Sequence, residues 1–209
     1  MKENESLYRE SLRLMTPALL EQASLFCGEG IGQVSNASTV IVTSLYARLT
    51  DFVQRPNQAV TVLEHLKECG HNGKMIDDPI RLFTDERTSS RAELLGERTL
   101  ALLLPGGAGQ LATLVAQESG VSLDAARVLS SRLACLLTDA VAVRVKASGI
   151  ARERAVRLVR ALQAQFSDVA AHLPALVVRE LAIQGPPVPV RQQEKAAPKS
   201  WLASFFRFA

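Results

Sequence analysis

Residues 103–150 read LLPGGAGQLATLVAQESGVSLDAARVLSSRLACLLTDAVAVRVKASGI, and this stretch decides the fold class. Its apolar residues recur at helical spacing, which predicts one helix over 109–119 and a longer one from Ser122 to about Ala147. Gly120 is expected to close the first helix, because glycine adopts the left-handed conformation in which many helices end, and Ser122 is expected to cap the second. No strand-length alternation competes, so the stretch predicts two α-helices joined by a tight turn.

The same helical periodicity extends over most of the chain. Thr16-Pro17 places a capping residue before a proline at the first helical position, which favours a helix to about Cys27. Apolar faces predict further helices over 33–54, over 58–67, from Ser89 or Ser90 to 104, and from 151, where the apolar side carries Ala155, Leu158, Val159, Leu162 and Phe166.

Two segments interrupt this pattern. Residues 71–90 are polar, and we expect a loop there with one short turn of helix around Ile80–Phe83. Ser167-Asp168 is expected to begin a last helix, which Pro174 kinks or divides. With these interruptions, the sequence predicts an all-α fold.

Two parts of the chain resemble each other without gaps at an offset of 88 residues. The identical pairs are Pro17 with Pro105, Gln22 with Gln110, Gly32 with Gly120, Ala37 with Ala125, Val40 with Val128, Leu45 with Leu133, and Leu49-Thr50-Asp51 with Leu137-Thr138-Asp139. We interpret segments 16–54 and 104–147 as pseudo-repeated helical hairpins. Since neither hairpin can bury its apolar face alone, we expect both to pack into one bundle-like domain over residues 1–185.

Composition narrows the function classes. The formal net charge of +3 over 209 residues is too small for a general nucleic-acid-binding field. The three cysteines form no CxxC pair, which excludes zinc and redox motifs of that kind. The first residues lack the apolar core of a secretory signal, and runs such as 100–104 fall far short of the ~20 apolar residues of a membrane span. We therefore expect a cytoplasmic protein with reduced thiols.

Residues 186–209 differ in composition from the rest. They carry four basic residues against Glu194 alone, so the whole net charge of +3 lies here, together with four of the ten aromatic residues and four of the nine prolines. We expect 186–200 to be a proline-rich extended linker and 201–209 to be an aromatic tail.

The two-part layout resembles a bacterial family known as domain of unknown function 937. The likeness covers roughly residues 12–178 and rests on the stretch quoted above, on a following helix like 151–166, and on a short segment like AHLPALV at 171–177. It implies a two-part, all-helical fold. It brings no catalytic, cofactor or metal residues to this chain.

Residues 115–130 contain the strongest nucleic-acid candidate. VAQESGVSLDAARVL (115–129) has the helix, glycine turn and capped second helix of a helix-turn-helix motif. A recognition helix offers Arg, Lys, Asn or Gln to base edges, whereas this helix begins with Leu123 and Asp124. We therefore favour a core helix and keep DNA binding as the alternative function.

Catalytic candidates are few. Asp51 and Asp139 are equivalent under the repeat and could form paired carboxylates for acid–base chemistry, although separate surface carboxylates are the commoner arrangement. The glycine-rich segment 104–110 follows a helix and lacks the Lys-Ser/Thr of a phosphate loop. We expect no catalytic site and no cofactor.

Metal ligation is likewise not expected. Cys69-Gly70-His71 puts a thiol and an imidazole too close together for easy tetrahedral ligation, so we interpret them as a loop thiol and a solvated histidine. Cys27 and Cys135 lie in apolar helical runs and are expected in the core. The basic side chains Arg152, Arg154, Arg157 and Arg160 are expected on a solvated face, partly paired with Glu153.

The aromatic tail carries the functional prediction. Capped by Ser200 as a short helix, it presents an apolar face beside basic residues, and so short a helix is ordered by what it binds. A protein groove, an anionic membrane surface and the protein's own body are the three possible docking sites. The sequence thus predicts a non-enzymatic helical adaptor, peripheral at the inner face of the membrane if it binds lipid, that docks through Trp201, Leu202, Phe205, Phe206, Arg207 and Phe208.

Overall fold

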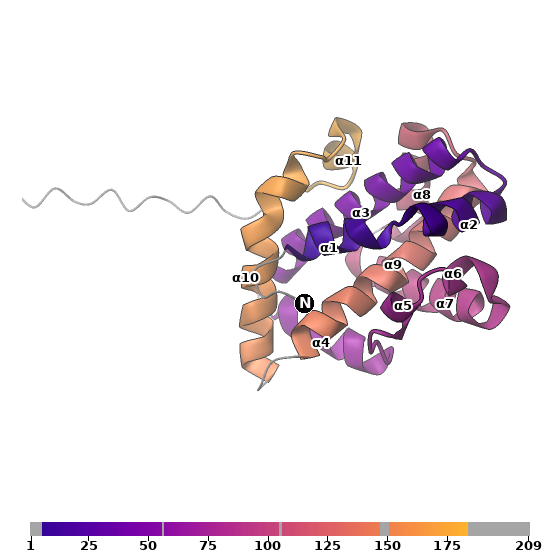
Figure 1. The fold of residues 1–209 in the computed structure, drawn as a ribbon. Coiled ribbons are helices and arrows are strands. Elements are labelled where there is room, and N and C mark those ends of the chain that lie inside the picture. Colours follow the sequence, from indigo (N-terminus) through magenta and orange to yellow (C-terminus); the bar gives the residue numbers. More distant parts are fainter. Residues whose placement is uncertain (1–5, 56, 105, 147–150, 184–209) are drawn as a thin grey trace, which may run out of the picture.

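The computed structural model describes residues 6–55, 57–104, 106–146 and 151–183. These ranges contain eleven helices and no strand: α1 (Leu7–Leu14), α2 (Pro17–Cys27), α3 (Ile31–Val53), α4 (Gln58–Glu68), α5 (Lys74–Asp77), α6 (Arg81–Thr84), α7 (Glu86–Leu103), α8 (Gly107–Ser119), α9 (Leu123–Lys146), α10 (Ala151–Ala170) and α11 (Ala175–Glu180). The all-α prediction is confirmed, and Figure 1 shows the helices gathered into a bundle-like body.

Helix α9 lies at the centre of this body. It contacts α7 and α8 most extensively and also packs on α3, α4, α5 and α10 (Figure 1). Residues 129–142 are all buried, because neighbours cover every side of the helix. α7 crosses so closely that a Cβ atom on Gly96 would overlap the backbone carbonyl of Ser131. Glycine is therefore required where these two backbones meet.

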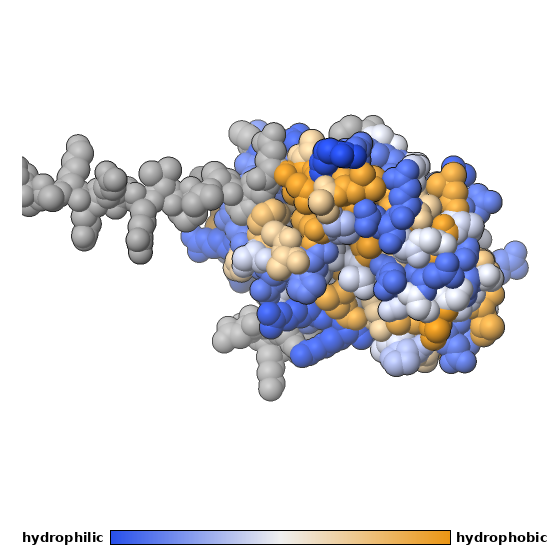
Figure 2. Space-filling view, turned by 90° about the horizontal axis from the view of Figure 1, so that it is seen from above, coloured by the Kyte–Doolittle hydropathy of each residue, from blue (hydrophilic) through white to orange (hydrophobic). Residues whose placement is uncertain are grey.

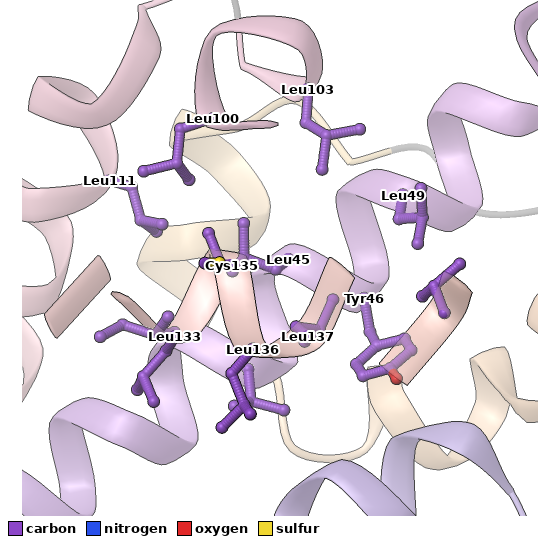
Figure 3. Packing of buried hydrophobic residues seen from close by; sticks show 14 of the residues in the cluster. Leu45, Tyr46, Leu49, Leu100, Leu103, Leu111, Leu133, Cys135, Leu136 and Leu137 are labelled. Carbon is purple, nitrogen blue, oxygen red and sulfur yellow. The ribbon is translucent and has the colours of Figure 1, made fainter. Parts of the chain in front are cut away.

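The hydrophobic core forms around α9. Figure 3 shows buried side chains from four helices meeting there: Leu45, Tyr46 and Leu49 of α3, Leu100 and Leu103 of α7, Leu111 of α8, and Leu133, Cys135, Leu136 and Leu137 of α9. The buried cluster also takes in residues of α1, α2, α4 and α10. Burying this apolar surface is the main driving force that holds the helices together.

Several helix ends fall where local signals placed them. The Thr16 hydroxyl accepts a hydrogen bond from the Leu19 amide at 3.2 Å, and Pro17 occupies the first helical position. Gly28 ends α2 in the left-handed conformation with φ +68°, and Gly120 ends α8 in the same way with φ +75°. The Ser122 hydroxyl accepts from the Ala125 amide at 3.3 Å as α9 begins. These ends depend on adjacent residues, so the sequence is enough to locate them.

Other helix ends differ from the prediction. α1 was not predicted, since the first helix expected from the sequence follows Thr16. The cap of α7 is Asp85 rather than Ser89 or Ser90, and it accepts a hydrogen bond from the Thr88 amide at 3.0 Å. α5 forms inside the expected loop at 71–90, while α6 lies at the expected short turn. α10 continues through Ser167-Asp168 to Ala170 because buried Val169 keeps its last turn on the core.

On the outer face of α10, Arg157 and Arg160 are exposed as predicted, whereas Arg154 is half-buried and the side chain of Arg152 is outside the described part of the chain. The apolar side of the helix is buried or half-buried, and Arg157 forms an exposed ion pair with Glu153 at 3.6 Å. Figure 2 shows the molecule from above, with hydrophilic and hydrophobic residues interspersed over this face. Among the described residues no single helix is both long and apolar enough to cross a membrane, and only the bent pair α7–α8 meets the length and composition required.

The two predicted hairpins correspond to α2–α3 and α8–α9. At the offset of 88, Ala37 and Ile41 match Ala125 and Leu129, and all four are buried. The left-handed glycines do not match at this offset, since Gly120 follows Gly28 by one helical turn more. The duplication itself stays a prediction, as do the boundary at 185, the linker 186–200 and the aromatic tail, all of which lie outside the described residues.

Candidate functional site

The chain leaves α4 through a glycine turn that directs a histidine inward. The Gly70 and His71 amides donate to the Lys67 and Leu66 carbonyls at 3.1 and 3.0 Å, the pattern of a Schellman motif. Gly70 has φ +66°, a conformation that glycine adopts without a steric penalty. The turn therefore places the His71 side chain against α9 rather than in solvent.

His71 is held there by a carboxylate of α9. Its Nδ1 lies 2.8 Å from Oδ1 of Asp139, and both side chains are almost completely buried. The other carboxylate oxygen of Asp139 accepts from the Met75 amide at 2.9 Å. Because an ionised carboxylate only accepts hydrogen bonds, Nδ1 carries a proton, and in the neutral imidazole the lone pair is then on Nε2. That Nε2 atom is buried and has no hydrogen-bond partner within the described residues.

Two further donor atoms on α4 complete the cluster. His65 and Cys69 are one helical turn apart and share a face of the helix, with the Cys69 sulfur 3.7 Å from Nδ1 and 3.8 Å from Nε2 of His65. His65 Nε2 lies 3.0 Å from the Thr99 hydroxyl, which gives its own proton to the Leu95 carbonyl at 3.1 Å. Nε2 of His65 is therefore the donor to Thr99, and Nδ1 keeps its lone pair.

Burial and nearby charges shift the pKa values of two groups at this cluster, His65 and Cys135. Burial lowers the pKa of the His65 imidazole, and the neighbouring His71 and Arg98 lower it further against an opposing effect of Glu68. Burial raises the pKa of Cys135 to about 12, with Asp139 adding to the shift, so this second buried thiol stays protonated. One ligand atom from each of His65, Cys69 and His71 lies within 4.8 Å of the others, so these three residues could hold a metal ion.

The interpretation of Cys69 and His71 as a loop thiol and a solvated histidine is wrong. Both side chains are buried, because Asp139 approaches from 68 residues away and covers the imidazole. The Cys-Gly-His spacing alone does not reveal the cluster, because the third ligand, His65, lies one turn earlier on α4. The usable signal is the His65-x-x-x-Cys69 spacing, which aligns two ligand side chains on a predicted helix.

Asp51, the equivalent of Asp139 under the repeat, forms a different buried pair. It accepts from the Arg48 guanidinium at 2.9 Å, and Arg48 also donates to the Leu103 and Leu181 carbonyls at 3.1 and 3.2 Å. Arg48 thereby ties the end of α7 and the residue after α11 to α3. Asp51 and Asp139 thus bind separate partners, Arg48 and His71, and each carboxylate positions its own partner.

The predicted helix-turn-helix corresponds to α8, the turn after Gly120, and α9. Protein contacts hold this turn: the Ser122 amide donates to the Glu29 carboxylate and the Gln33 amide group donates to the Gly120 carbonyl, both at 2.8 Å. The hydrogen bonds from Ser122 lower the pKa of Glu29. Leu123, Asp124 and Arg127 are exposed on the first turns of α9.

The predicted docking residues cannot be compared with this geometry. They lie in the aromatic tail, outside the described residues: Trp201, Leu202, Phe205, Phe206, Arg207 and Phe208. The last described residues before the linker are nonetheless fixed to the body, since Leu181 is buried and the Gln110 side chain donates to the Glu180 carbonyl at 2.9 Å.

Comparison with known proteins identifies a family. Residues 11–142 match the family described as "Bacterial protein of unknown function (DUF937)", a span that includes the His65–Cys69–His71 cluster and Asp139. Searches of curated proteins and of solved structures returned no match. The chain belongs to the bacterial DUF937 family, as the match over residues 11–142 shows.

Proposed function

We propose that this protein is a non-enzymatic helical scaffold that is attached to a partner through its aromatic tail, residues 201–209. The observation that carries the proposal is compositional: residues 186–209 hold the whole net charge of +3 and four of the ten aromatic residues. A short segment that combines aromatic and basic side chains suits the interface of an anionic membrane or a groove on another protein.

The packing of the preceding residues supports this role. Buried Arg48 donates to the Leu181 carbonyl, and Gln110 donates to the Glu180 carbonyl. The segment that leads into the linker is thus fixed to α3 and α8. A tail that starts from a fixed point holds its partner within a defined radius of the helical body, as a scaffold requires.

Membrane attachment at the cytoplasmic face is the form of the proposal we would test first. Each Lys or Arg near an anionic surface contributes about 1 kcal/mol, so Lys195, Lys199 and Arg207 give weak, salt-sensitive attraction. The aromatic side chains add binding by entering the interface between headgroups and acyl chains. Neither contribution alone suffices for stable attachment.

The test compares full-length protein with a 1–185 truncation in co-sedimentation with phosphatidylserine-containing and purely zwitterionic vesicles, at low and moderate salt. The proposal expects binding of the full-length chain to anionic vesicles that weakens with salt and is lost in the truncation. Phe205→Ser with Phe206→Ser should abolish binding, while Phe26→Ser, which alters an exposed aromatic residue of α2, should not. Equal binding of both chain lengths would contradict the membrane form.

If neither chain length binds vesicles, the scaffold proposal expects a protein partner, and docking on the protein's own body is the alternative. Cell fractionation and crosslinking of the full-length and truncated chains then give the decisive comparison. Loss of specific crosslinks in the truncation supports the scaffold proposal. Unchanged localisation and unchanged crosslinks would overturn it.

The alternative function is DNA binding through residues 115–130. The exposed Arg127 on the first turns of α9 is the feature that favours it. This alternative expects sequence-dependent binding at physiological salt that Arg127→Ala weakens and that Arg160→Ala, a change on the exposed face of α10, leaves intact. Equal affinity for DNA of different sequences would eliminate this alternative.

A further inference from the structure

We propose that His65, Cys69 and His71 bind a zinc-class divalent metal ion, with Asp139 and Thr99 orienting the two imidazoles. This inference is independent of the docking function of the tail. It concerns the junction of α4, the turn at 70–73 and α9, where three ligand-bearing side chains gather in the described part of the chain.

The donor spacing fits a zinc ion. Zinc binds cysteine sulfur at about 2.3 Å and histidine nitrogen at about 2.0–2.1 Å in tetrahedral geometry, which places the two donors about 3.6 Å apart. The Cys69 sulfur and Nδ1 of His65 are 3.7 Å apart. The ligand atoms of all three residues lie within 4.8 Å of one another, so small side-chain adjustments bring them to one ion.

The hydrogen bonds to Thr99 and Asp139 engage one ring nitrogen of each histidine and leave the other nitrogen for a metal ion. His71 gives its Nδ1 proton to Asp139, and His65 gives its Nε2 proton to Thr99. In the neutral form each imidazole then has one unprotonated nitrogen, which is the form that binds metal. Nε2 of His71 is buried without a partner, an unsatisfied polar atom that a metal ion would satisfy.

The partners of the two imidazoles are those of a second coordination shell. Metal-bound histidines usually donate their other ring N–H to a carboxylate or another oxygen, which fixes the tautomer and the ring orientation. Asp139 does this for His71 and is itself fixed by the Met75 amide, while Thr99 does it for His65. Two nitrogen ligands and one thiolate favour zinc over magnesium or calcium, which prefer oxygen.

A polar cleft lies on the Asp139 side of this cluster. It has a volume of about 520 Å³ and opens to solvent, and Gly70, Asn72, Met75 and Asp139 are among its lining residues. Three protein ligands leave one coordination position for a water molecule or another small ligand.

The test is titration of untagged, full-length, chelator-treated protein with Co²⁺, a spectroscopic substitute for zinc. The inference expects saturation at one equivalent, visible bands of tetrahedral intensity and a near-ultraviolet sulfur-to-cobalt band, all displaced by Zn²⁺. Cys69→Ala should remove the sulfur band, and His71→Gln should lower cobalt affinity at least tenfold. Asp139→Asn should keep the band but weaken affinity about 10–100-fold.

Matched controls lie elsewhere in the fold. Cys27→Ala and His172→Gln alter a thiol and an imidazole outside the cluster and should leave the spectrum unchanged. Cys135→Ala should also keep the sulfur band, which separates the two buried thiols. Circular dichroism checks that each variant keeps its helix content, and a wild-type titration without saturable cobalt uptake overturns the inference whatever the variants do. So does a sulfur band that survives in folded Cys69→Ala.

Discussion

His71 donates its Nδ1 proton to Asp139 across 2.8 Å, and this bond joins the turn after α4 to the middle of α9 over a sequence separation of 68 residues. The pair is almost completely buried, so it is protected from competing water. It also fixes which nitrogen of His71 is free. One interaction thus serves both the packing of the 70–77 segment and the proposed metal centre.

Replacing the carboxylate should destabilise the fold even without metal. Asp139→Ala leaves the buried His71 Nδ1–H and the half-buried Met75 amide without their acceptor. Unsatisfied donors of this kind cost about 1–3 kcal/mol each, so we expect the free energy of unfolding to fall by about 2–4 kcal/mol. Urea unfolding in the presence of chelator measures it. Asp124→Ala, an exposed change on the same helix, should stay within about 0.5 kcal/mol.

Because α7 and α9 cross closely at Gly96, we expect any side chain at this position to destabilise the fold. Gly96→Ala forces the two backbones apart, because its Cβ would overlap the Ser131 carbonyl. We expect the free energy of unfolding to fall by about 1–3 kcal/mol. Gly109→Ala is the matched control, since open space surrounds that helical glycine. The control should be neutral or stabilising by up to about 1 kcal/mol. Similar unfolding midpoints for the two variants would contradict the close crossing.

Arg48 should be essential for fixing the segment after α11. Arg48→Met removes the donor to the Leu181 carbonyl and leaves Asp51 without its buried partner. Breaking a buried ion pair from one side costs about 3–5 kcal/mol. We expect that loss together with faster hydrogen exchange across 175–183. Arg160→Met, on an exposed face, should change neither quantity, and normal protection of 175–183 in Arg48→Met would argue against the anchor.

The stability that the Asp85 cap gives to the start of α7 should depend on pH. Hydrogen bonds from Thr88 to Asp85, assisted by Arg81, lower the carboxyl pKa below its ordinary value of 3.8. A group with a lowered folded pKa stabilises the fold above its unfolded pKa, and this contribution is lost as pH falls through the folded value. The stability difference between wild type and Asp85→Asn should therefore narrow from pH 7 to about pH 3. Denaturant unfolding at both pH values measures it, and a constant difference would refute the charged cap.

The predictable part of the fold is the part that adjacent residues and apolar periodicity determine. Thr16-Pro17, Gly28 and Gly120 mark helix ends through adjacent residues, and the apolar sides of α3 and α10 follow from periodicity. α1 also has local signals, since Ser6 precedes it, Glu10 lies in its first turn and Arg13 in its last, although it is not among the helices predicted above. Its position depends on tertiary contacts, including the Tyr8 amide donating to the Gln165 side chain at 2.8 Å across 157 residues.

The candidate site was less predictable for the same reason. Burial of His71 depends on Asp139, and the two meet only once α4 and α9 have packed. The His65–Cys69 spacing is local and could have been noticed, but its importance depends on a third ligand beyond the helix end. The repeated Thr-Asp pairs acquire separate roles, since Asp51 holds Arg48 and Asp139 holds His71.

The central claim is that the cluster of His65, Cys69 and His71 binds a metal ion. Its most direct test is the zinc content of untagged, full-length protein after incubation with Zn²⁺ and gel filtration, measured by elemental analysis beside the folded variant His65→Gln/Cys69→Ala/His71→Gln. The account predicts close to one zinc ion per wild-type chain and almost none in the variant. Equal zinc content in the two proteins, or no zinc retained by the wild type, would contradict it.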